Sequence, residues 1–195
     1  MTLVSAAVLL FLVIDPLGNI PFFLSALSAV PAERQRLVVV RELSFALGVL
    51  VLFLFAGRYL LALLQISEPA LTTAGGVILF LIALRMIFPS SLHTLAEQVR
   101  GEPFLVPLAV PYVAGPSALA TELLLMSREP GRWPEWLAAL LLAWGATCVI
   151  LYFASGMRRF LGERGLIALE RLMGMVLITV SIQMLMNGVD QFLRR

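Results

Sequence analysis

The chain has 195 residues, of which 61% are hydrophobic and 13% are charged, and its mean hydropathy is +0.98. Soluble domains are closer to half apolar and a quarter charged, so this composition excludes a water-soluble globule and predicts a single-domain integral membrane protein. The net charge of +2 comes without a cluster of basic and aromatic residues, which argues against a nucleic-acid partner.

The first apolar segment covers about residues 3–28 and is interrupted near its middle. In "FLVIDPLGNIPFF", the ionisable Asp15 is followed by Pro16, Gly18, Asn19 and Pro21. Proline disfavours helix at the residue before it, and glycine permits a turn. The apolar stretch before Asp15 would form about 18 Å of helix, too short to cross about 30 Å of hydrocarbon. We therefore predict two half-helices that meet at Asp15 and Asn19, where N–H groups near Asn19 and Ile20 solvate the Asp15 carboxylate.

Two uninterrupted apolar segments follow, at about 43–64 and 71–88. An arginine-rich connection over 28–41 precedes them, and a second connection over about 90–103 follows them. Each segment is long enough to cross a bilayer as one helix.

The fourth segment, at about 104–126, repeats the interruption with other residues. Its stretch "VPLAVPYVAGPSALAT" carries Pro107, Pro111, Gly115 and Pro116, and then Ser117 and Thr121. Irregular backbone at membrane depth persists only where protein buries it or where it lines a wet cavity. We therefore predict a second break here. Uninterrupted segments at about 136–156 and 170–191 complete six spans.

The arginines predict the orientation, because short cytoplasmic loops are enriched in basic residues. Nine of the 14 basic residues, all of them arginine, fall on one side of this topology, and five fall on the other. The nine include those of the 28–41 connection. We expect that side to be cytoplasmic and both termini to be extracytoplasmic.

An internal repeat relates the two halves of the chain. "GGVILFLIALRM" at 75–86 aligns with "MGMVLITVSIQM" at 173–184 at an offset of 98 residues, and both breaks fall in the first span of a triplet. An odd number of spans per repeat inverts the second copy. We predict an all-α integral membrane fold of six transmembrane helices, built as two inverted three-helix repeats with helices 1 and 4 broken near the bilayer midplane. Repeat one covers about 1–89, repeat two about 104–195, and the cytoplasmic linker about 90–103.

Broken helices of this kind predict a binding site. Half-helix N-termini favour an anion such as a carboxylate, whereas freed carbonyls and Asp15 favour a cation. A small zwitterion, alone or with a coupling Na⁺ or H⁺, matches both. The predicted substrate and ion site comprises Asp15, Pro16, Gly18, Asn19, Pro111, Gly115, Pro116, Ser117 and Thr121.

Two residues are candidate accessories to this site. Glu122 follows Thr121 and is either a second cavity carboxylate or a structural partner of an arginine. Gln183 is the repeat equivalent of Arg85 and is either near the cavity or an interhelical hydrogen-bonding residue.

Functions other than transport are less consistent with the sequence. Serine catalysis at Ser117 would need a base in reach, and His93, the one histidine, falls in a connecting loop. We expect no enzyme, no cofactor and no metal site. An intramembrane hydrolase is the weakest alternative, and a non-transporting membrane regulator or assembly protein stays open.

Four stretches carry a resemblance to a known family: "DPLGNIPFF" at 15–23, "GGVILFLIALRMIFP" at 75–89, "PLAVPYVAGPSALAT" at 107–121 and "ALERLMGMVL" at 168–177. Through them the chain resembles the MarC family of bacterial inner-membrane proteins, in particular its YhgN-like branch, over nearly its whole length. The resemblance implies six spans with external termini.

Functionally, the resemblance implies transport of small neutral amino acids such as glycine and alanine, as in the SnatA-like members. The motif residues match at Asp15, Pro16, Gly18, Asn19, Pro21, Pro107, Pro111, Gly115 and Pro116. Glu122 departs from the apolar residue expected there. The sequence therefore predicts a multi-pass, ion-coupled amino-acid transporter of the bacterial inner membrane, with lipid as its surroundings and with direction, ion and oligomeric state undetermined.

Overall fold

A computed structural model describes residues 1–27, 30–88, 104 and 108–193 of the chain. It is built from helices, as predicted. In chain order they are α1 (Leu3–Ile14), α2 (Ile20–Ala26), α3 (Ala32–Leu64), α4 (Glu68–Ile87), η2 (Leu108–Val113), α6 (Pro116–Arg128), η3 (Pro130–Arg132), α7 (Trp133–Tyr152) and α8 (Ala154–Leu193). The predicted linker at about 90–103, His93 and Pro107 lie outside the described residues.

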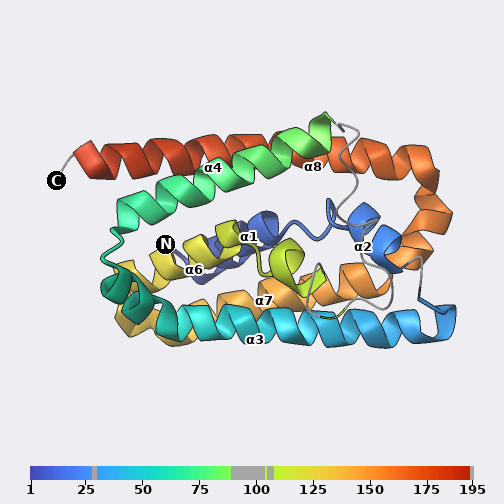
Figure 1. Ribbon diagram of the computed structural model, residues 1–195, viewed down its shortest axis with the longest axis horizontal. Coiled ribbons are helices and arrows are strands. Elements are labelled where there is room, and N and C mark those ends of the chain that lie inside the picture. The colour runs from blue at the N-terminus through green and yellow to red at the C-terminus, as the bar shows by residue number, and fades with distance from the viewer. Residues whose placement is uncertain (28–29, 89–103, 105–107, 194–195) are drawn as a thin grey trace.

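The helices form an elongated bundle (Figure 1). α4 and α8 pack together along one edge, α3 and α7 lie along the opposite edge, and the short helices α1, α2 and α6 occupy the space between them. Both termini lie at one end, with the α3 to α4 turn. The α2 to α3 and α7 to α8 connections lie at the other end. The broken segments are therefore held between two pairs of long helices.

Four described helices are long and apolar enough to cross a membrane: Ala32–Gly57, Pro69–Ile87, Pro130–Tyr152 and Arg164–Leu193. Their outward faces are apolar, with Leu52, Leu142 and Met186 each more than half exposed. Apolar side chains on an outer surface suit contact with lipid. The remaining apolar helix, α1, has 12 residues and is too short to span alone.

Two helix boundaries differ from the sequence prediction. α3 begins at Ala32, so most of the expected 28–41 connection is helical, because the buried stripe of Val39, Leu43, Ala46 and Leu50 continues backwards at helical spacing. α8 starts well before residue 170 and is interrupted at Gly162, whose φ of 66° and ψ of 177° suit glycine.

α4 and α8 meet through a row of close backbone approaches, which we call the seam. A Cβ placed on Gly76 would lie 3.0 Å from the Ser181 carbonyl and from the Leu185 amide nitrogen. A Cβ on Gly174 would lie 3.1 Å from the Ala83 carbonyl and 2.9 Å from Ile87. Glycine at these places lets two regular helices pack backbone to backbone, as small residues do in membranes.

Candidate functional site: the junction of two broken helices

The first break lies at the end of α1. Asp15 takes the left-handed conformation, with φ 48° and ψ 62°, and its N–H still bonds the Phe11 carbonyl at 3.0 Å. Aspartate is among the few residues that adopt this conformation at low cost, and Pro16 next to it lacks the N–H that a helix would need. α2 then begins at Ile20, with Pro21 in its first turn. The break predicted between two half-helices is therefore present.

Gly18 holds the Asp15 carboxylate in place. Its N–H donates to Asp15 Oδ1 at 3.1 Å. The donors expected from the sequence serve other acceptors, because the N–H of Asn19 bonds the Asp15 backbone carbonyl and that of Ile20 bonds Leu17. A Cβ on Gly18 would overlap the Asp15 carboxylate and the Met86 side chain. Gly18 is thus required for the space beside Asp15, whereas the left-handed residue of the turn is Asp15 itself.

The carboxylate of Asp15 is nearly sealed from solvent, since the residue is 5% exposed. Within the described part of the chain, no arginine pairs with it, and Glu170 of α8 lies close enough to act on it electrostatically. A buried carboxylate in such surroundings is unfavourable unless a cation or proton joins it. The position therefore suits a positively charged ligand.

The second break follows η2, a single wide turn closed by the Ala114 N–H bonding the Ala109 carbonyl at 2.9 Å. The backbone is extended at Val110 and again at Gly115, and α6 then starts with Pro116 in its first turn. Pro111 lies within η2. The predicted interruption of the fourth segment is therefore present, and its helical part, α6, has 13 residues.

Asn19 connects the two breaks. Its side-chain Nδ2 donates to the Ile14 carbonyl at 2.8 Å and to the Tyr112 carbonyl at 2.9 Å. Ile14 belongs to the first break and Tyr112 to the second, and 93 residues separate Asn19 from Tyr112. The rings of Phe22 and Tyr112 also stack, with centroids 4.9 Å apart. We call the region formed by residues 14–19 and 112–117 the junction.

Ser117 and Thr121 extend from the junction into α6. Both are 2% exposed, and the Thr121 hydroxyl donates to the Ser117 carbonyl at 2.8 Å. Ser117 lies against α4, where its Cα would be 3.9 Å from a Cβ on Gly75.

Of the two accessory candidates, Glu122 is fully buried on α6, whereas Gln183 is exposed and bonds Asn187 on its own helix. The structure does not bring Gln183 to the junction.

Sequence reasoning missed two further residues, Tyr112 of η2 and Glu42 of α3. Tyr112 contributes a backbone carbonyl, and the residue type gives no indication of a backbone contact. Glu42 lies on α3, which packs against η2, and is 0% exposed, with Arg41 Nη2 3.0 Å from its Oε1. The predicted connection ends at residue 41 and the second segment begins at about residue 43, so Glu42 falls in neither. The helical spacing of Val39, Glu42 and Ala46 would have put it on the buried face.

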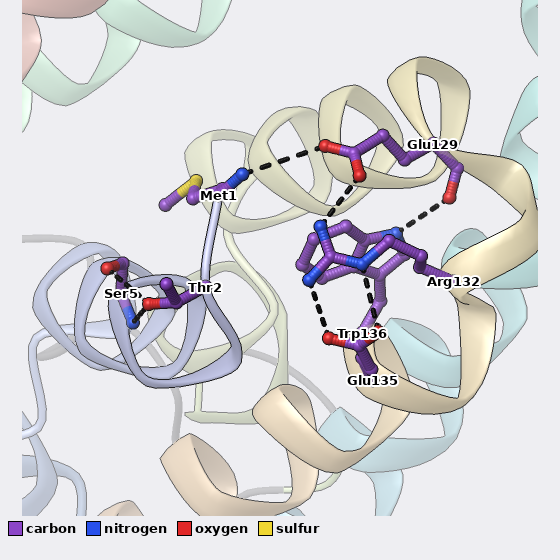
Figure 2. Close-up of polar contacts among 7 residues, drawn as sticks. All are labelled: Met1, Thr2, Ser5, Glu129, Arg132, Glu135 and Trp136. Atoms are coloured by element: carbon purple, nitrogen blue, oxygen red, sulfur yellow. Dashed lines mark hydrogen bonds and ion pairs between the residues drawn. The ribbon is translucent and has the colours of Figure 1, made fainter.

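A polar cluster of different character lies at the end of the bundle that holds the termini (Figure 2). The Arg132 guanidinium bonds Glu129 at 2.6 Å and both carboxylate oxygens of Glu135, and it stacks 4.6 Å from the Trp136 ring centroid. The Met1 ammonium lies 3.6 Å from Glu129. Hydrogen bonding from Arg132 lowers the pKa of Glu129 below its usual range. We call this group the Arg132 cluster.

Comparisons with known proteins agree with the helical membrane architecture. The sequence pattern of the family described as MarC family integral membrane protein matches residues 1–193. The chain is 48% identical to the inner membrane protein YhgN of Escherichia coli strain K12 over 193 residues, which cover 98% of each protein. It is 43% identical to a membrane protein of Buchnera aphidicola over 98% of both chains, and 33% identical to one of Chlamydia muridarum over 97% of this chain and 93% of that protein. No solved structure matches the chain.

Proposed function

The chain belongs to the MarC family of integral membrane proteins, and from that membership and the junction we propose that it is a secondary transporter of small neutral amino acids. Its membrane is the bacterial inner membrane, as the name of its YhgN relative indicates for that protein. Transport is coupled to an ion, and the chain is not an enzyme.

The observation that carries the proposal is the pair of hydrogen bonds made by Asn19. One amide group satisfies carbonyls freed at both breaks, Ile14 at 2.8 Å and Tyr112 at 2.9 Å. Broken spans that meet near the middle of a bundle are where secondary transporters bind substrate and coupling ion. A single site at the junction would therefore be reached from either side when one half of the bundle moves against the other.

The chemistry of the junction favours a small zwitterion. The Asp15 carboxylate suits an ammonium group, and the N-terminal N–H groups of α6, which follow Pro116, suit a carboxylate. The side chains around them are small or tightly packed, because Gly18 has no room for a Cβ and Ser117 is 2% exposed. A substrate with a small neutral side chain fits these limits best.

The seam supports an inverted repeat. Gly76 and Gly174 are 98 residues apart, the offset of the internal repeat. Gly76 approaches Ser181 and Leu185, and Gly174 approaches Ala83 and Ile87, which are the equivalents of those two residues at the same offset. Reciprocal contacts between equivalent positions are what a two-fold axis between α4 and α8 would produce.

We propose that both termini are extracytoplasmic. They lie at the same end of the bundle, as six spans require, and the beginning of α3 lies at the opposite end (Figure 1). Arg34, Arg36 and Arg41 belong to this first part of α3. The positive-inside rule then makes that opposite end cytoplasmic.

Among the alternatives, a hydrolase finds little support, because Ser117 is buried at the start of α6. A regulator or assembly protein would not need Asp15 to be ionisable.

The proposal is tested by reconstituting the purified chain in liposomes. We expect saturable uptake of labelled glycine and alanine, stimulated by an imposed proton or sodium gradient, and little uptake of bulky or charged amino acids. Protein-free liposomes give the background. Flux equal to that background for every amino acid tested would contradict a transport function.

A further inference from the structure

Glu122 is a buried acid that the junction does not use. It is 0% exposed, and neither carboxyl oxygen has a hydrogen-bond partner. On α6, Ala120 faces Gly75 of α4 and Leu123 faces Gly57 of α3. Successive residues of a helix are about 100° apart, so Glu122 points away from α4. α6 also packs against α1 and α7.

Among the side chains that the structure describes, the elements packed around α6 supply no hydrogen-bond partner for this acid. α1 has no ionisable residue before its cap, Asp15. Among the ionisable side chains described on the other packed elements are Glu42 and Tyr59 of α3, Arg85 of α4, Arg132 of η3, and Glu135 and Cys148 of α7. None of these donates to Glu122, whose two oxygens stay without a partner. Arg132 and Glu135 are occupied with each other at the end of the bundle.

A metal ion does not suit this position. Hard cations require several oxygen ligands, and the residues that the structure describes contain no group of three acidic, histidine or cysteine side chains. The Thr121 hydroxyl beside Glu122 is committed to the Ser117 carbonyl. An ionised carboxylate left bare in an apolar interior is strongly unfavourable, whereas a proton needs no second ligand.

Glu42 provides the contrast within the same chain. It is equally buried, but the guanidinium of Arg41 lies 3.0 Å from its Oε1. The two glutamates therefore differ in the presence of a counter-charge and not in burial.

We propose that Glu122 is a proton-binding site, neutral in this conformation, which exchanges its proton with water when α6 moves during transport. α6 is joined to η2 through residues 114–115, and a tilt of α6 about this connection would expose the acid. This proposal rests on the proposed function for its role in transport, because it names the proton as the coupling ion. The protonation of Glu122 is independent of the proposed function.

Protonation is measured first, by infrared difference spectroscopy of the full chain in lipid. We expect the C=O stretch of a protonated carboxyl to be present in the wild type, to shift in heavy water, and to be lost in Glu122→Gln. The matched control Glu33→Gln removes an exposed glutamate and should keep the band. If Glu122→Gln leaves the protonated-carboxyl region unchanged, the acid is ionised and the proposal is wrong.

Coupling is measured next, in proteoliposomes with an imposed proton gradient. Glu122→Gln should still exchange amino acid across the membrane but should lose gradient-driven accumulation by about tenfold or more, which corresponds to 1.4 kcal/mol. Glu122→Leu, an apolar residue of similar size, is the second variant should the amide disturb folding, and the same result is expected. Wild-type accumulation by either folded variant would overturn the coupling role.

Failure of the two proposals gives different results. A wild type without any amino-acid flux contradicts the proposed function, while the infrared band still decides whether Glu122 holds a proton. A wild type whose accumulation follows sodium and ignores the proton gradient keeps the transporter and removes Glu122 as its coupling site.

Discussion

The junction and the seam are both places of close approach between distant parts of the chain, yet they are built in opposite ways. At the seam, helical stretches of α4 and α8 meet through Gly76, next to backbone atoms of Ser181 and Leu185, and through Gly174, next to Ala83 and Ile87. At the junction, the helices are interrupted and Asn19 ties freed carbonyls together. Regular backbone satisfies its own polar groups, whereas interrupted backbone must find partners or a ligand. The seam is therefore structural, whereas the junction can serve as a binding site.

Replacing Asn19 by leucine should have the largest effect on the junction. The substitution removes the donors to the Ile14 and Tyr112 carbonyls. Each buried carbonyl left unpaired costs about 1 to 3 kcal/mol, so we expect the folded state to lose about 2 to 6 kcal/mol. Thermal unfolding in detergent micelles measures this. Stability equal to wild type would mean that the two breaks are not held together by Asn19.

Gly18→Ala should impair function more than stability. The new Cβ overlaps the Asp15 carboxylate and the flexible Met86 side chain, both of which can move aside. A displacement of about 1 Å at a reacting group can cost about a hundredfold in rate, and we expect a loss of that order in amino-acid flux. Flux is compared at equal amounts of folded protein. Unchanged flux would show that the position of Asp15 is not critical.

Gly76→Ala should impair stability more than function. Its Cβ would meet backbone atoms at 3.0 Å, which cannot rotate away, so α4 and α8 must separate. Overpacking of this kind costs about 1 to 3 kcal/mol, with flux per folded molecule retained. Gly174→Ala should cost a similar amount, because its contacts are the repeat equivalents. A large difference between the two alanine variants would count against the proposed two-fold relation.

The Arg132 cluster should give the smallest effect, because its members are partly exposed. Arg132 lowers the pKa of Glu129 in the folded state, so the pairing stabilises the fold at neutral pH. That contribution is lost as the pH falls below the unfolded value of about 4.3 and through the folded one. The melting temperature of wild type should exceed that of Glu129→Gln at neutral pH and converge with it in acid. A difference that persists in acid would assign Glu129 another role.

The sequence predicted the breaks correctly because their causes are local. Proline and glycine within an apolar run interrupt a helix wherever the chain folds, and Asp15 beside Pro16 marks the place. The predicted start of α3 is wrong, because the arginine-rich stretch is helical and the buried spacing through Glu42 continues into it.

The contacts that make one site of the two breaks could not be predicted. Asn19 bonds a backbone carbonyl 93 residues away, and a carbonyl acceptor leaves no signal in the residue type of Tyr112. The outward position of Gln183 follows from the rotation of α8, which is fixed by seam contacts at Ser181 and Leu185. Both features depend on tertiary packing, and the pattern of apolar residues does not specify which helix faces pack together.

The central claim is that the junction binds substrate through a charged Asp15, and gradient-driven uptake by Asp15→Asn tests it most directly. Asparagine keeps the size and tolerates the left-handed conformation of residue 15, so the variant should insert and fold. Asp190→Asn, the same change at an exposed aspartate of α8, is the matched control. We predict that Asp15→Asn shows no uptake above protein-free liposomes while Asp190→Asn matches wild type. Uptake by Asp15→Asn at the wild-type rate, with the same ion dependence, would contradict the claim.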